Sequence, residues 1–229
     1  MKKVEWLSMV IAVAIMGMSA LALAHGVEGE DAAFIQGIQG VAIPEFIYLG
    51  AKHMVTGYDH LLFLVGVIFF LHRLKDVALY VSLFTLGHSI TLLAGMLGGI
   101  HANPYIIDAI IGLSVVYKAL DNLGAFERVL GFQPNTKAAV AIFGLFHGFG
   151  LATKLPELTL SDEGLVANIL SFNVGVEIGQ VLALAGILLV FAYWRTRPGF
   201  LRHALVVNAA LMCGGFLLMG YQLTGYWRA

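Results

Sequence analysis

The chain has 229 residues, of which 59% are hydrophobic and 12% are charged, and its formal net charge is -1. A soluble domain carries about twice that share of charged residues, so the composition excludes an ordinary soluble protein. The charge is near neutral and no basic tract occurs, which gives nucleic-acid binding no support. We therefore expect the lipid bilayer, and not nucleic acid, to be a partner of the chain.

Long apolar segments recur along most of the sequence and determine the predicted fold class. Only helices or closed barrels satisfy the backbone in lipid, and continuous apolar runs favour helices over alternating barrel strands. We predict an all-α polytopic membrane protein with a six-helix transmembrane bundle. A signal peptide or uncleaved N-terminal helix and a short interfacial or re-entrant helix precede it. The spans are expected at about 58–72, 77–98, 104–122, 138–154, 164–194 and 200–222.

The residues before the first span divide into two parts. Lys2 and Lys3, a following apolar run and Ala22-Leu23-Ala24 are typical of a signal peptide with a small-residue cleavage site. The apolar run is also long enough for an uncleaved helix. We assign residues 1–24 to this signal peptide or N-terminal helix, 25–57 to an extracytoplasmic tail and interfacial or re-entrant segment, and 58–229 to the six-span transmembrane domain.

Basic residues gather in every second loop between the predicted spans. Lysine and arginine concentrate in cytoplasmic loops, so this asymmetry predicts the orientation of the chain. The loops after the first, third and fifth spans then face the cytoplasm, and the segment after residue 24 lies outside. These loops contain Arg73, Lys75, Arg128, Lys137, Arg195, Arg197 and Arg202. We expect a multi-pass protein of the bacterial inner membrane.

Polar and ionisable side chains interrupt the apolar segments at similar predicted depths. Such groups are costly in hydrocarbon unless they are paired or ligated, so they usually mark functional sites. Imidazole together with carboxylate is a ligand set suited to divalent transition metals. The shared depth predicts one outward-facing metal site. Its candidate ligands are His53, Asp59, His60, His88, His147, Asn173 and Glu177.

The segment from His53 to His60 allows two geometries. On a continuous helix, His53 and His60 share a face, and Asp59 orients an imidazole from behind it. If Gly57 breaks the helix, both histidines and Asp59 converge on one ion. The sequence leaves both geometries open.

The fifth predicted span carries a polar stripe. Asn173, Glu177 and Gln180 are spaced i, i+4 and i+7, whereas Gly175 and Gly179 allow another helix to approach closely. At this depth Glu177 is a metal ligand, a proton carrier or both in alternation. A neutral acid that is hydrogen-bonded between helices is the alternative.

Four motifs, in this order, resemble the HupE/UreJ family over about residues 45 to 195. They are His53-x5-Asp59-His60, Phe-Thr-Leu-Gly-His88-Ser, Phe-Gly-Leu-Phe-His147-Gly-Phe-Gly and Phe-Asn173-Val-Gly-Val-Glu177-Ile-Gly-Gln. Members of that family are bacterial inner-membrane proteins associated with hydrogenase and urease operons and regarded as nickel, sometimes cobalt, permeases. The resemblance implies that His53, Asp59 and His60 match one motif needed for transport and that His147 matches another, Phe-His-Gly.

The sequence departs from the hydrogenase-linked members after His147. Those members continue with a second His-Gly and a glutamate on the same helix, whereas Gly148-Phe149-Gly150 follows here. The chain is therefore more similar to the second, less characterised branch of the family. In this branch Glu177, on the next helix, is a candidate for the missing carboxylate.

The leading hypothesis is a permease, not an enzyme, for Ni²⁺ or Co²⁺ as transported substrate, without an organic cofactor. Zn²⁺, Fe²⁺ and Cu²⁺ stay as alternatives, although copper usually calls for more sulfur ligands than Cys213 and the scattered methionines offer. The Gly-x4-Gly-Lys-Ser/Thr loop of ATP hydrolysis does not occur in the sequence. Because protons compete for histidine nitrogens, uptake is expected to fall below about pH 6.

Other functions stay open. The chain is alternatively a membrane accessory that binds metal or delivers it to another protein. An intramembrane metalloenzyme is a weaker alternative because no His-x3-His or His-Glu-x2-His box occurs. A haem-binding electron carrier is weaker still. A homo-oligomer and a metalloenzyme-maturation partner are both compatible with the sequence.

Overall fold

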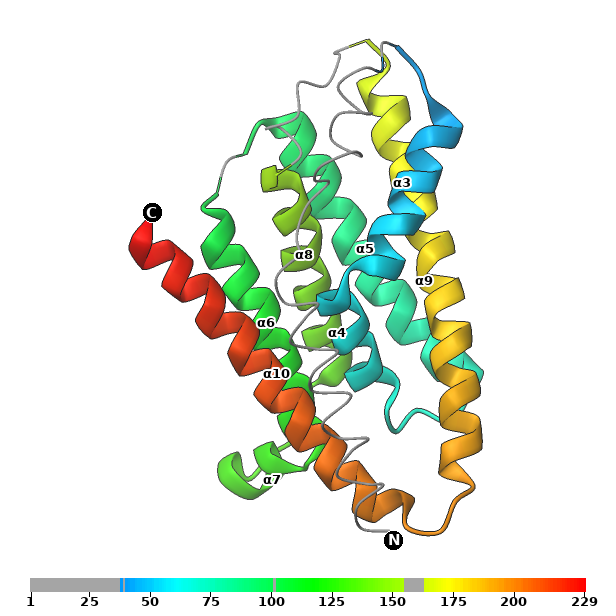
Figure 1. Cartoon of the computed structure of the whole chain (residues 1–229), viewed down its shortest axis with the longest axis vertical. Coiled ribbons are helices and arrows are strands. Elements are labelled where there is room, and N and C mark those ends of the chain that lie inside the picture. Colours follow the sequence, from blue (N-terminus) through cyan, green and yellow to red (C-terminus); the bar gives the residue numbers. More distant parts are fainter. Residues whose placement is uncertain (1–37, 39, 101, 155–162) are drawn as a thin grey trace, which may run out of the picture.

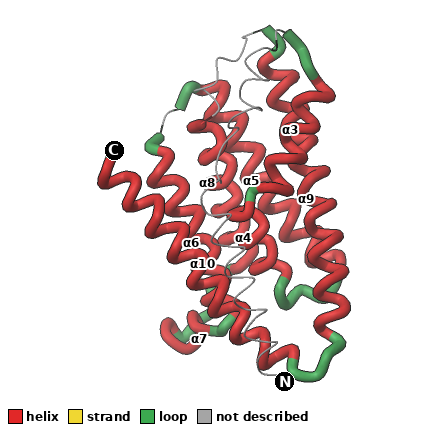
Figure 2. The backbone as a smooth tube through the Cα atoms, viewed as in Figure 1, coloured by secondary structure: helices red, strands yellow, loops and turns green. Residues whose placement is uncertain are grey.

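The computed structural model describes residues 38, 40–100, 102–154 and 163–229, and this part of the chain is built of helices without strands (Figures 1 and 2). The predicted signal peptide or N-terminal helix lies outside the described residues, as does most of the tail from residue 25. The helices are α3 (Ile43–Thr56), α4 (Tyr58–Ile68), α5 (Leu74–Gly98), α6 (Pro104–Asn122), α7 (Ala125–Leu130), α8 (Thr136–Lys154), α9 (Leu165–Arg195) and α10 (Phe200–Arg228).

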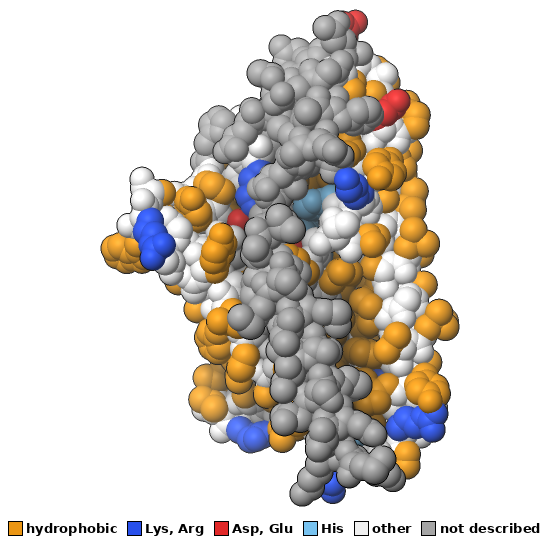
Figure 3. All heavy atoms as spheres, in the orientation of Figure 1, with side chains coloured by type: hydrophobic (Ala, Val, Ile, Leu, Met, Phe, Trp, Pro, Cys, Tyr) orange, Lys and Arg blue, Asp and Glu red, His pale blue; other side chains and the backbone are white. Residues whose placement is uncertain are grey.

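Four of the described helices, α5, α8, α9 and α10, are long and apolar enough to cross a membrane. Large hydrophobic side chains cover the flanks of the molecule (Figure 3). Leu189 of α9 and Leu201 of α10, for example, are 74% and 75% exposed. Extensive apolar surface is unfavourable in water, so these flanks suit contact with lipid.

Close contacts through glycine join the helices in three pairs. α5 lies against α8, α3 against α9 and α6 against α10. A Cβ atom on Gly144 of α8 would lie 2.3 Å from the backbone oxygen of Phe84, and one on Gly112 of α6 would lie 2.7 Å from the nitrogen of Met219. The backbones therefore touch where the side chain is absent, as is common between membrane helices.

Gly175 and Gly179 perform the predicted role in the pair of α3 and α9. A Cβ atom on Gly175 would lie 2.0 Å from the backbone oxygen of Ile47, and one on Gly179 would lie 2.5 Å from that of Ala51. The two helices run parallel because residue numbers rise together along the contact. The segment predicted as interfacial or re-entrant thus forms a helix packed lengthwise against α9 (Figure 1).

α3 and α4 are two halves of an interrupted helix that is joined at Gly57. The backbone of Gly57 is extended, with φ -70° and ψ 93°, and its N–H donates to the oxygen of His53 at 2.8 Å. α4 ends at Ile68, earlier than the predicted 72. The guanidinium of Arg195 donates hydrogen bonds of 2.7 Å to the carbonyl oxygens of Ile68 and Phe69, which caps the helix there.

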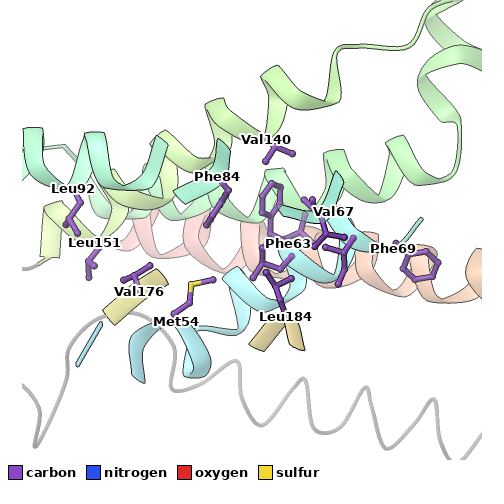
Figure 4. Packing of buried hydrophobic residues seen from close by; sticks show 14 of the residues in the cluster. Met54, Phe63, Val67, Phe69, Phe84, Leu92, Val140, Leu151, Val176 and Leu184 are labelled. Atoms are coloured by element: carbon purple, nitrogen blue, oxygen red, sulfur yellow. The ribbon is translucent and has the colours of Figure 1, made fainter. Parts of the chain in front are cut away.

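The basic residues of the predicted cytoplasmic loops lie at one end of the bundle, which we call the basic end and which lies at the bottom of Figure 1. α5, α8 and α10 begin there, and α6 and α9 end there. Lys118 and Asp121 form a buried ion pair one helical turn apart near this end. Between the helix pairs lies the apolar core, to which Met54, Phe63, Phe84, Leu151 and Val176 contribute (Figure 4).

Candidate metal centre

Three imidazoles from three helices meet inside the bundle. His53 of α3, His60 of α4 and His88 of α5 each offer a ring nitrogen, and these atoms all lie within 4.8 Å of one another. His60 is 3% exposed and His88 is fully buried. Nitrogen ligands about 2.1 Å from a metal lie roughly 3–3.5 Å apart, so a small movement of the rings brings all three into coordination. The group fits a divalent transition metal.

A carboxylate orients the middle imidazole. Nδ1 of His60 lies 3.0 Å from Oδ1 of Asp59, and both side chains are buried. Because an ionised carboxylate only accepts hydrogen bonds, Nδ1 carries the proton and Nε2 keeps the lone pair. This carboxylate–histidine arrangement raises the basicity of an imidazole ligand and fixes its direction.

Gly57 decides between the two geometries that the sequence left open. It breaks the helix, and the two histidine rings on either side come to a centroid distance of 5.1 Å. Oδ1 of Asp59 faces Nδ1 of His60. A Cβ atom at Gly57 would lie 3.0 Å from Nδ1 of His60 and 3.2 Å from Oδ1 of Asp59, so the glycine also leaves the space that this pair occupies.

His147 of α8 lies beside the three-histidine cluster. Its ring centroid is 4.9 Å from that of His60. Its Nδ1 lies 2.8 Å from the carbonyl oxygen of Phe143. A carbonyl only accepts, so Nδ1 carries the proton, and Nε2 is the nitrogen with a lone pair for metal. His147 is thus a fourth imidazole within reach of an ion that moves past His60.

Unsatisfied nitrogens support the cluster as a binding site. Neither ring nitrogen of His88, nor Nε2 of His60, has a hydrogen-bond partner among the residues that the structure describes. The hydroxyl of Thr91 donates to the carbonyl oxygen of Leu145 at 2.6 Å instead of holding the His88 ring. Buried polar atoms without partners are rare in folded proteins, and an ion at this position would satisfy them.

The predicted polar stripe on α9 divides between the interior and the surface. Asn173 is buried, and its Oδ1 has no hydrogen-bond partner within the described residues. Gln180 is also buried and accepts a 2.6 Å hydrogen bond from Thr85 of α5. Glu177, which the sequence placed in the same pocket, is exposed. It is rotated by about 60° from Gln180 around the helix, which turns it out of the contact with α5.

Aromatic rings that were not predicted as site residues enclose the imidazoles. Phe84 lies 5.0 Å from His147, Phe63 lies 5.3 Å from His147, and Phe172 lies 5.9 Å from His53, measured between ring centroids. The spacing Phe-x3-His, shared by the second and fourth predicted spans, was the signal that could have identified Phe84 and also Phe143, whose ring lies 5.9 Å from that of Phe63.

A family model described as HupE / UreJ protein matches residues 29–229. Comparison with curated proteins gives no match, and neither does comparison with solved structures. The matched residues include every helix described above and all the histidines of the site. The chain therefore belongs to the HupE/UreJ family.

Proposed function

We propose that this protein is a permease of the bacterial inner membrane that transports a divalent transition metal, Ni²⁺ or Co²⁺, and that it is not an enzyme. Family membership and four apolar helices support a metal-related role in a membrane. The observation that carries the proposal is the group of His53, His60 and His88 inside the bundle. Buried ionisable groups at this depth are expensive and mark ion pathways.

The donor atoms favour a transition metal of intermediate softness as the substrate. Neutral imidazole suits Ni²⁺, Co²⁺, Zn²⁺ and Cu²⁺, whereas oxygen ligands suit Mg²⁺ and Ca²⁺. The one cysteine of the sequence, Cys213, is exposed on α10, so the cluster is made of imidazoles without thiolate.

The path for the ion follows from the proposed topology. We take α3 with α4, α5, α6, α8, α9 and α10 as six crossings, with the basic end in the cytoplasm. α6 is less apolar than the other long helices because it carries charged residues. These charges are paired, Asp108 with Lys154 at 2.7 Å and Lys118 with Asp121, so α6 is still counted as a crossing. The ion enters from the opposite end and meets the histidines before it reaches the basic end.

Uptake of a nickel radioisotope by cells that lack other nickel importers tests this function. We expect expression of the protein to restore uptake, and His60→Ala to reduce it to background because the oriented imidazole is lost. His72→Ala is the matched control, since His72 is exposed in the loop after α4. Full uptake by the His60→Ala variant would refute the proposal. Stoichiometric binding by purified protein without flux into liposomes would assign the chain to metal delivery instead.

A further inference from the structure

We propose that Phe63 and Phe84 form the inner gate of the metal path, closed directly below the histidine cluster and opened by movement of α4. This inference rests on the proposed transport function and names the residues that control passage toward the basic end.

Each of three helices carries a phenylalanine one turn from its histidine, always on the side of the basic end. The pairs are His60 with Phe63 on α4, His88 with Phe84 on α5, and His147 with Phe143 on α8. α4 runs toward the basic end, whereas α5 and α8 run away from it (Figure 1). Steps of +3 on α4 and of -4 on α5 and α8 therefore displace the rings in the same direction. A layer of phenylalanines underlies the layer of imidazoles.

The ring of Phe63 contacts the other two phenylalanine rings of this layer, and Phe63 and Phe84 both contact the ring of His147. The centroid of Phe63 lies 5.3 Å from that of Phe84 and 5.9 Å from that of Phe143. Phe63 is fully buried and Phe84 is 1% exposed (Figure 4).

The phenylalanine layer closes the proposed path to an ion. The rings of Phe63 and Phe84 pack in direct contact and themselves offer no donor atom to an ion that leaves the histidines. Apolar constrictions of this kind stop ions by excluding water. The ion passes only when the rings separate.

α4 is a short helix of its own, separated from the helices before and after it. It has 11 residues and begins at the break at Gly57. The helix does not continue beyond its inner end, where side chains hold it instead. Arg195 caps the carbonyl oxygens of Ile68 and Phe69, and Nδ2 of Asn122 donates to the carbonyl oxygen of Gly66 at 2.8 Å. Interrupted helices of this type line the substrate sites of many transporters.

The proposed metal ligand and the proposed gate residue of α4 lie on one face of that helix. His60 and Phe63 are three residues apart, so they lie on the same side of the helix, one turn from each other. When the imidazoles close around an ion, His60 draws the start of α4 with it. The same displacement moves Phe63 relative to Phe84 on α5. Occupancy of the cluster is thereby coupled to the opening below it.

Flux of Ni²⁺ into liposomes that contain the purified protein and a trapped nickel-sensitive dye tests the gate. We expect Phe63→Ala to raise the initial rate of influx by about fivefold or more, because the constriction loses its central ring. Ni²⁺ binding, measured by equilibrium dialysis, should be retained because the imidazole ligands are unchanged. Phe69→Ala is the control, because Phe69 is equally buried but contacts Phe191, Trp194 and Phe200 near the basic end.

A conservative pair of variants protects the test against a folding defect. Phe63→Leu and Phe84→Leu keep apolar volume but remove the ring contacts, and each should raise influx by about twofold. Variants that bind Ni²⁺ as the wild type does and show unchanged or slower influx overturn the gate. If the wild type itself neither binds nor transports Ni²⁺, the proposed function fails. If the wild type transports Ni²⁺ but the variants show no rise in the rate of influx, the gate is refuted and the proposed function stands.

Discussion

His60 is the residue around which the candidate centre is arranged. Its ring lies 5.1 Å from that of His53, 5.9 Å from that of His88 and 4.9 Å from that of His147, measured between centroids. Asp59 holds one of its nitrogens and leaves the other for an ion. The sequence alone predicted these residue types and the order of their motifs, and it offered the orientation of an imidazole by Asp59 as one of two geometries without deciding between them.

Replacing Asp59 tests how the carboxylate supports the imidazole. We expect Asp59→Asn to weaken Ni²⁺ binding by about 10- to 100-fold, because a neutral amide neither fixes the His60 tautomer nor raises its basicity. Equilibrium dialysis of the purified protein measures the affinity. Asp76→Asn, in the first turn of α5, is the matched control. Equal affinities in the two variants would contradict the role of Asp59.

The exposure of Glu177 leads to a second prediction at this scale. Because Glu177 is exposed whereas His60 is buried, we expect Glu177→Gln to weaken Ni²⁺ binding less than His60→Ala does. Competition between each purified variant and a chelator of known affinity measures both losses. An equal or larger loss in Glu177→Gln would show that the carboxylate reaches the ion after all.

Spacing along α9 could not predict where Glu177 points. A stripe at i, i+4 and i+7 spans about 60° of a helix, and the partner helices decide which edge of that stripe is buried. Here the hydrogen bond from Thr85 to Gln180 holds one edge of the stripe against α5. Such a contact joins residues 95 positions apart and is not visible in local sequence patterns.

At the scale of helices, glycines determine how closely the histidine-bearing segments approach. A Cβ atom on Gly148 would lie 2.0 Å from the backbone oxygen of His88. The contact between α5 and α8 at the depth of the site therefore depends on that missing side chain. Substitution there separates the two helices that carry His88 and His147.

Thermal unfolding in detergent tests this packing. We expect Gly148→Ala to lower the free energy of unfolding by about 1–3 kcal/mol, since the added methyl group overpacks a rigid backbone contact. Gly186→Ala is the control, because a Cβ atom there would meet nothing within 4 Å. Alanine at that open helical position should be neutral or stabilise by up to about 1 kcal/mol. A Gly148→Ala variant as stable as the control would contradict the assignment.

Hydrophobicity predicted the later helices well and the first one poorly. α6 begins and ends where the sequence predicted, and α5, α8 and α9 agree to within a few residues. α4 stops at Ile68 although apolar residues continue, because Arg195 caps it from a distant part of the chain. α10 extends to Arg228, beyond the predicted 222, since nothing in its apolar pattern marked an end.

For the whole molecule, the basic end defines the proposed orientation. Attachment of a membrane-impermeant maleimide to single cysteines tests it in a Cys213→Ser background. Ala229→Cys should react from the periplasmic side of intact cells, whereas Thr196→Cys, in the exposed loop between α9 and α10, should react only after lysis. The reverse pattern would invert the path proposed for the ion.

X-ray absorption spectroscopy of the Ni²⁺-loaded protein tests most directly whether the buried imidazoles bind the transported metal. We expect nitrogen scatterers at about 2.1 Å with the multiple-scattering pattern of imidazole. That pattern should weaken in His88→Ala, because His88 offers one of the three clustered nitrogens. A shell of oxygen atoms alone, or a spectrum that His88→Ala leaves unchanged, would contradict the histidine cluster as the metal site.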